Sequence, residues 1–188
     1  MNKRYEMRLT GSGGQGVILA TIILADAGLM AGKNILQSQS YGPEARGGMC
    51  KAEVIVSDGV IGFTKVIRPG FLLALTQAAL EKYSQNLPPD CLVMVDESLK
   101  LPTCLEGRKV IAIPILRTAL EKVGKAFTAN IVAVGAINAA LNLASPEQLE
   151  QAVFRHIPAD TKELNRRALH EGESLIKSHP LQSLLEIA

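Results

Sequence analysis

The 188-residue chain contains no tryptophan, and aromatic residues make up only 4% of it. Proteins that bind single-stranded nucleic acid use aromatic rings to stack bases, so this composition argues against that class. The net charge of +2 lacks the basic excess typical of nucleic-acid and membrane-surface binding. No apolar run reaches the ~18 residues of a membrane span, and MNKRYEMR lacks the apolar core of a signal peptide. We therefore expect a cytoplasmic protein with neither a nucleic-acid nor a membrane partner.

Residues that bind metals are scarce. The three cysteines, Cys50, Cys91 and Cys104, are scattered and never reach C-x-x-C spacing, which argues against a disulfide framework, a zinc site or an iron–sulfur cluster. The three histidines lie in the last third of the chain without the spacing of a metal site. The sequence therefore predicts no metal bound by this chain alone.

The remaining composition is that of a globular protein. Hydrophobic residues make up 47% of the chain and charged residues 20%. A length of 188 residues suits one domain with a sizeable core, so we expect a single domain over residues 1–188.

A glycine-rich turn, Gly11-Ser12-Gly13-Gly14-Gln15-Gly16, follows a short predicted strand and precedes a long apolar helix. In this context G-x-G-x-x-G is typical of loops that bind phosphate groups. Glycine lets the ligand approach the backbone, and the first N–H groups of the helix attract an anion. These six residues are the candidates for contact with a phosphate-bearing ligand. The alternative is that the glycines serve only to pack the helix closely against the strand.

The end of the second predicted strand lacks an acidic residue. An NAD-binding site of the usual kind has Asp or Glu there, ~20 residues after the glycines, to bind the ribose hydroxyls. This chain has Gln37, Ser38 and Gln39 instead. An NAD- or flavin-linked dehydrogenase stays an alternative, but this absence disfavours it.

A second polar, glycine-rich stretch leaves that strand: Ser38-Gln39-Ser40-Tyr41-Gly42-Pro43-Glu44-Ala45-Arg46-Gly47-Gly48. Open α/β sheets bind ligands at the carboxyl ends of their strands, so we expect both glycine loops to converge at one edge of the sheet. The alternative is a flexible connection that carries a surface ion pair between Glu44 and Arg46.

The apolar pattern predicts a Rossmann-like α/β fold, a three-layer sandwich with a mostly parallel sheet. Residues 51–56 alternate, and the Asp58-Gly59 turn predicts an antiparallel hairpin with residues 60–61. Residues 130–143 are too apolar for an exposed helix, so they lie centrally or in an interface, with Thr128 as their N-cap. The other predicted strands are 5–9, 33–38, 71–75, 91–95 and 109–114, and the other helices are 17–30, 76–86, a short one from 145, and 161–177.

GSGGQG before a helix, followed by QSQSYGPEARGG, resembles the gamma subunit of the 2-oxoacid:ferredoxin oxidoreductases. This is the pyruvate/ketoisovalerate ferredoxin oxidoreductase gamma family, and the second loop is most similar to its 2-oxoglutarate branch. The resemblance continues through residues 51–57, 73–77 and 130–138 and ends near Glu163-Leu164-Asn165, with Ala168 and Gly172.

The resemblance implies a division of labour within a larger enzyme, which converts a 2-oxo acid, coenzyme A and oxidised ferredoxin to acyl-CoA, carbon dioxide and reduced ferredoxin. Thiamine diphosphate, Mg²⁺ and [4Fe–4S] clusters are expected on other subunits, namely alpha, beta and delta. This chain is expected to be inactive alone, to complete the active-site chamber and to help bind coenzyme A. Glu44 and Arg46 are given a supporting role in catalysis, and Ser40, Tyr41, Gly42, Gly47 and Gly48 join the first loop in binding. A structural assembly subunit that binds no ligand remains the alternative.

Overall fold

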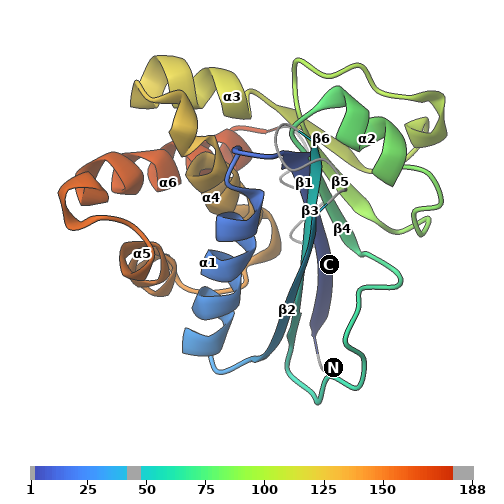
Figure 1. Ribbon diagram of the computed structural model, residues 1–188, viewed down its shortest axis with the longest axis horizontal. Helices are drawn as coiled ribbons and strands as arrows, with labels where there is room; N and C mark the ends of the chain where they lie inside the picture. Colours follow the sequence, from blue (N-terminus) through green and yellow to red (C-terminus); the bar gives the residue numbers. More distant parts are fainter. Residues whose placement is uncertain (1–2, 42–47, 180–188) are drawn as a thin grey trace.

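A computed structural model of the chain describes residues 3–41 and 48–179 (Figure 1). Its strands are β1 (Arg4–Ser12), β2 (Asn34–Tyr41), β3 (Met49–Ser57), β4 (Phe71–Ala74), β5 (Leu92–Asp96) and β6 (Val110–Ile113). Its α-helices are α1 (Val17–Met30), α2 (Gln77–Tyr83), α3 (Ile115–Arg117), α4 (Ala129–Leu141), α5 (Pro146–Arg155) and α6 (Lys162–Lys177). A π-helical segment, Thr118–Val123, continues α3.

These strands form one sheet in the order β2-β3-β1-β4-β5-β6. Strands β1, β4, β5 and β6 pair in parallel, whereas β3 runs antiparallel to both of its neighbours, β1 and β2. The mostly parallel sheet and its antiparallel addition are confirmed.

The predicted partner of the antiparallel strand was wrong. Residues 60–61 form no strand, and β3 pairs instead with β2 through the connection 42–48. Its opposite edge is bonded to β1 along nine residues, so β3 has no free edge on which residues 60–61 could pair. After Ser57 the chain leaves the sheet through a turn in which the Gly59 N–H donates to the Ser57 hydroxyl at 3.1 Å.

Helices cover both faces of the sheet, which confirms the three layers. Helices α1, α4, α5 and α6 lie on one side and α2 on the other (Figure 1). Alternate residues of β4 show why both faces need a cover: Phe71 and Leu73 pack into the larger core, and Leu72 and Ala74 pack into the smaller one near α2. Strand β5 divides its side chains in the same way.

Helix α4 lies in the centre of the larger core, as its apolar sequence predicted. Almost every side chain along it is buried, and α1 and α6 flank it. The hydroxyl of Thr128 does not cap this helix, contrary to expectation. It donates to the carbonyl of Lys125 at 2.7 Å, because the residues before α4 form a 3-10 turn, Ala126–Thr128, rather than an extended cap.

Two glycines allow α4 and α6 to approach closely. A Cβ added to Gly135 would lie 2.3 Å from the carbonyl oxygen of Leu169, and one added to Gly172 would lie 2.0 Å from that of Val132. Backbone atoms cannot move aside as the end of a long side chain can, so any larger residue must push the helices apart.

We expect Gly135→Ala and Gly172→Ala each to destabilise the fold by about 1–3 kcal/mol, the usual loss from overpacking a core. Part of this loss will be offset because alanine favours helix by up to about 1 kcal/mol. Gly62→Ala is the matched control, since a Cβ there meets open space. Urea titration of the three variants tests this, and equal stability of all three would contradict the close packing of α4 and α6.

Candidate functional site

The first glycine loop joins the carboxyl end of β1 to the start of α1. Two of its glycines have left-handed backbone, Gly14 with φ +93° and Gly16 with φ +70°. The Gln15 side chain folds back within the loop, and its Oε1 accepts from the Ser12 N–H at 2.8 Å. The Gln15 N–H in turn donates to the Ser12 carbonyl at 3.2 Å. Gln15 therefore fixes the shape of the loop, with its side-chain oxygen already used.

The glycines of this loop differ in what surrounds them. A Cβ on Gly11 would lie 2.5 Å from the Gln15 Oε1, and a Cβ on Gly16 would lie 2.4 Å from the Nδ2 of Asn130. A Cβ on Gly14 would meet nothing within 4 Å. Close packing thus accounts for Gly11 and Gly16, whereas Gly14 offers its backbone to an open surface.

Helices α1 and α4 begin beside one another at this loop. The buried side chain of Asn130, in the first turn of α4, donates from Nδ2 to the Gly16 carbonyl at 3.4 Å. Its Oδ1 accepts from the Ile131 N–H at 3.0 Å. Because the N-terminus of a helix carries partial positive charge, the two starts together favour an anion near the glycine loop.

The second glycine-rich stretch returns to the first. Ser40 and Tyr41 end β2, and the carbonyl of Gly48 accepts from the Gly13 N–H at 2.9 Å. The predicted convergence of the two stretches at one sheet edge is confirmed. Gly42, Glu44, Arg46 and Gly47 lie outside the described residues.

The end of β2 also argues against an NAD site. Residues 37–39 lie within β2, and β3 separates β2 from β1, so these residues are not on a strand next to the one that leads into the glycine loop. Gln37 donates from Nε2 to the Thr21 hydroxyl of α1 at 3.1 Å, which ties its amide to the fold.

A row of charges near the glycine loop was missed at the sequence level. Arg8 of β1 faces Glu53 of β3, with Nε and Oε1 2.7 Å apart, and Lys51 Nζ lies 3.4 Å from the same oxygen. The side chains of Arg8 and Glu53 are 18% and 6% exposed. Arg8 is level with Leu72 of β4, so this row lies on the α2 face. The Lys51-x-Glu53 alternation was the available signal, but a strand pattern does not reveal which strand supplies the opposite charge.

Both carboxylate oxygens of Asp96, at the carboxyl end of β5, already accept hydrogen bonds from within the chain. Its Oδ1 accepts from the backbone and hydroxyl of Ser98, at 3.0 and 2.5 Å, and its Oδ2 accepts from the Leu116 N–H at 2.8 Å. This buried carboxylate fixes the start of α3 and has no spare oxygen aimed at a ligand.

A cavity of about 810 Å³ lies at the other end of the parallel strands, away from the glycine loops. Its apolar lining includes Phe71 and Ile176. The charged groups around it mostly contact one another or the backbone, since Lys177 pairs with Glu173 at 2.7 Å and Arg108 donates to three carbonyls. None of the predicted site residues lines it.

Within residues 3–41 and 48–179, no three His, Cys, Asp or Glu side chains are placed to hold a metal ion. Burial raises the pKa of the Cys50 thiol and raises that of Cys91 to about 11. Cys104 is half-buried, and its sulfur lies 3.3 Å from the Ser84 hydroxyl. The search for membrane-spanning helices in the same residues found none.

Residues 6–175 match the pyruvate ferredoxin/flavodoxin oxidoreductase family. The chain belongs to this family. It is 42% identical over 187 residues to the 2-oxoglutarate synthase subunit KorC of Methanocaldococcus jannaschii, and the match covers 94% of this chain and 99% of that protein. The crystal structure of a keto/oxoacid ferredoxin oxidoreductase gamma subunit from Geobacter sulfurreducens PCA is similar, with a TM-score of 0.82 and 44% identity over 93% of this chain and 99% of that one.

A third match shows the same fold inside a longer polypeptide. It is the 2-oxoglutarate:ferredoxin oxidoreductase of Magnetococcus marinus, with 2-oxoglutarate, coenzyme A and succinyl-CoA bound. The TM-score is 0.85 at 21% identity, and the match covers 94% of this chain but 32% of that one.

These matches confirm the family, the gamma-type fold and the 2-oxoglutarate branch that the two loops indicated. The chain thus belongs to a family of oxidoreductase subunits, and a protein 42% identical to it over almost its whole length is a subunit of 2-oxoglutarate synthase.

The fold makes a prediction for the three thiols. With a pKa of about 11, only about one Cys91 in a thousand is ionised at pH 8, and the thiolate is the reactive form. We expect iodoacetamide to modify Cys104 first, and Cys50 and Cys91 only slowly until urea unfolds the chain. Timed alkylation followed by peptide mass spectrometry measures the order. Modification of Cys91 in the native chain as fast as Cys104 would contradict its burial.

Proposed function

We propose that the gamma subunit completes the active-site chamber of the oxidoreductase, and that its glycine loop contacts the phosphate groups of coenzyme A. The observation that carries this proposal is the open, left-handed backbone of Gly14 beside the start of α1. A phosphate can approach such a backbone closely, where the free N–H groups of a helix start favour negative charge.

Two further features support the same surface. The ends of the second loop meet the first through the Gly13–Gly48 hydrogen bond, so residues from both stretches can act on one ligand. Lys51, opposite Thr10 in the sheet register, adds a positive charge close to the loop. Coenzyme A is an anion, and the related fold of the Magnetococcus marinus enzyme occurs in a complex that binds it.

For the residues of the second loop, Arg46 is proposed to pair with a carboxylate of the 2-oxo acid or a phosphate of coenzyme A, since a guanidinium binds either through two hydrogen bonds. Glu44 is proposed to orient that loop. Ser40, Tyr41, Gly42, Gly47 and Gly48 are proposed to line the same binding surface. The single-domain organisation, a delta subunit and a cytoplasmic location also stay predictions.

A subunit that only supports assembly is the second candidate. The tight contacts of Gly11 and Gly16 favour it, because packing alone explains those glycines. Gly14 has no close neighbour, so packing does not explain it; its left-handed backbone favours glycine, and the open side of the loop leaves room for a ligand.

The two candidates differ in what Gly14→Ala does. The new methyl group projects to the open side of the loop, so we expect a raised KM for coenzyme A in the assembled enzyme, by threefold or more. Gly32→Ala is the control, because Gly32 has a similar φ of +76° and open space but lies at the far end of α1. Alanine at position 32 therefore causes similar backbone strain, but away from the glycine loop. Equal coenzyme A kinetics in both variants would exclude phosphate contact at Gly14.

Arg46→Lys tests the second loop. Lysine keeps the charge but loses the two-pronged geometry, so we expect kcat/KM for the 2-oxo acid or coenzyme A to fall about ten- to hundredfold. That fall matches a charged hydrogen bond worth roughly 1.5–3 kcal/mol. Arg155→Lys, an exposed change on α5, is the control.

Wild-type and variant complexes with equal iron–sulfur cluster and thiamine diphosphate content are compared by their kcat/KM for the 2-oxo acid and for coenzyme A. A surface pair with Glu44 would be worth only about 0–1 kcal/mol. A change of less than about threefold, below the 1.4 kcal/mol of a tenfold effect, would therefore make Arg46 a surface residue.

A further inference from the structure

The connection between β3 and β4 exposes an unusual amount of apolar surface. It runs for thirteen residues, Asp58 to Gly70, without helix or strand. Val60, Phe63 and Ile67 along it are 91%, 62% and 72% exposed, three of the seven large hydrophobic side chains that stand exposed in the described residues. Loops of this length without secondary structure are usually functional or disordered.

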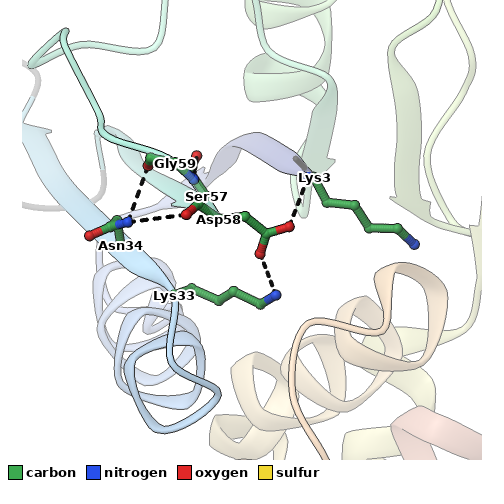
Figure 2. Close-up of polar contacts among 6 residues, drawn as sticks. All are labelled: Lys3, Lys33, Asn34, Ser57, Asp58 and Gly59. Atoms are coloured by element: carbon green, nitrogen blue, oxygen red, sulfur yellow. Dashed lines mark hydrogen bonds and ion pairs between the residues drawn. The ribbon is translucent and has the colours of Figure 1, made fainter. Parts of the chain in front are cut away.

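This connection is ordered at its start by a cluster of polar contacts (Figure 2). The Asp58 carboxylate accepts from the Lys3 N–H at 2.9 Å and from the Lys33 ammonium group. The Asn34 amide donates to the Gly59 carbonyl at 3.2 Å. The hydrogen bond from Lys33, and then that from Lys3, keep the pKa of Asp58 below its ordinary value, so the carboxylate stays charged at neutral pH.

The middle and the end of the connection are fixed as well. Val66 is buried, and its carbonyl accepts from Nη2 of Arg8 at 3.2 Å, while the same guanidinium is held by Glu53. The Gly70 N–H donates to the Glu6 carbonyl at 2.9 Å. The exposed apolar side chains are therefore presented by a loop that is fixed at three points.

We propose that Val60, Phe63 and Ile67 form a docking surface for another subunit of the same oxidoreductase. A fixed loop loses little conformational entropy on binding, and an aromatic side chain among apolar neighbours is the usual centre of an interface. Large apolar side chains that one loop holds in water give an isolated chain no stability, whereas exposed apolar surface is a mark of interaction sites.

The chain itself points to the occupant. It belongs to a multi-subunit enzyme, and its fold also occurs as about a third of a longer polypeptide, where its surface must meet the remainder of that chain. Lys65 and Arg68 flank the apolar side chains, are exposed, and form no ion pair with any described residue. The matching surface of the partner is accordingly apolar with an acidic rim.

This surface is separate from the glycine loops. It contacts Lys3, which precedes β1, Glu6 near the start of the strand and Arg8 in its middle, whereas the glycine loop follows the strand's last residue, Ser12. In Figure 1 the connection projects near the N-terminus, on the α2 side of the sheet. The inference rests on membership of the complex and not on coenzyme A contact, so the two are tested separately.

Phe63→Glu and Ile67→Glu place a carboxylate in the surface, and Leu29→Glu does the same to a 56% exposed leucine at the end of α1. Each variant is co-expressed with the partner subunits, and the purified complex is diluted while mass photometry follows its dissociation. We expect the midpoint of dissociation to rise at least tenfold in protein concentration for Phe63→Glu and Ile67→Glu, with no change for Leu29→Glu.

An unchanged midpoint would overturn the inference, and so would an equal rise for Leu29→Glu. A fall of several degrees in the Tm of the isolated Phe63→Glu chain would overturn it as well, because it would mean that these side chains pack within the chain. Loss of self-association by the isolated chain with normal complex assembly would assign the surface to a second copy and overturn it too. Coenzyme A kinetics, measured above the dissociation midpoint, stay normal if only docking is weakened, which keeps this test independent of the glycine loop.

Discussion

The pairing of β3 with strands on both of its edges is the constraint on which both proposed surfaces depend. Because β3 runs antiparallel between β2 and β1, the connection that leaves the carboxyl end of β2 enters β3 beside the carboxyl end of β1, where the glycine loop lies. The register then sets Gly11 beside Cys50, and the Gly13–Gly48 hydrogen bond continues the ladder past the last paired residues. The second loop is thereby tied to the first without any side chain being needed.

The same pairing determines where the chain goes after β3. With neither edge free, residues 58–70 cannot extend the sheet and instead cross to reach β4 on the far side of β1. Arg8 holds them there, and its own position depends on Glu53. A buried ion pair adds little net stability over an apolar pair, because desolvation offsets the attraction, but removing one partner is costly. Here the ion pair holds Arg8 in place, and the directional hydrogen bond from Arg8 fixes the path of residues 58–70 more closely than an apolar contact would.

Sequence patterns were sufficient for elements whose ends carry local signals. Gly16 and Gly32 mark the two ends of α1, and Ser145 before Pro146 forms the capping box that starts α5. Strand partners were not predictable in this way, since an alternating run such as residues 51–56 shows which side is buried but not which strand lies beside it. Thr128 failed for a related reason: an N-cap needs extended backbone before the helix, and the preceding residues set that backbone.

The candidate site was predictable in outline from its glycines, but their individual roles were not. A glycine in the sequence shows only that a side chain is absent. The reason for that absence depends on the local backbone and on neighbours that the sequence does not reveal. Asn130, more than a hundred residues away, lies against Gly16, and the Gln15 side-chain oxygen lies against Gly11. Gly14 has a left-handed backbone with no neighbour to avoid. Within one motif, close neighbours therefore surround Gly11 and Gly16, whereas Gly14 is a glycine because of its left-handed backbone and is the position at which the loop leaves open space.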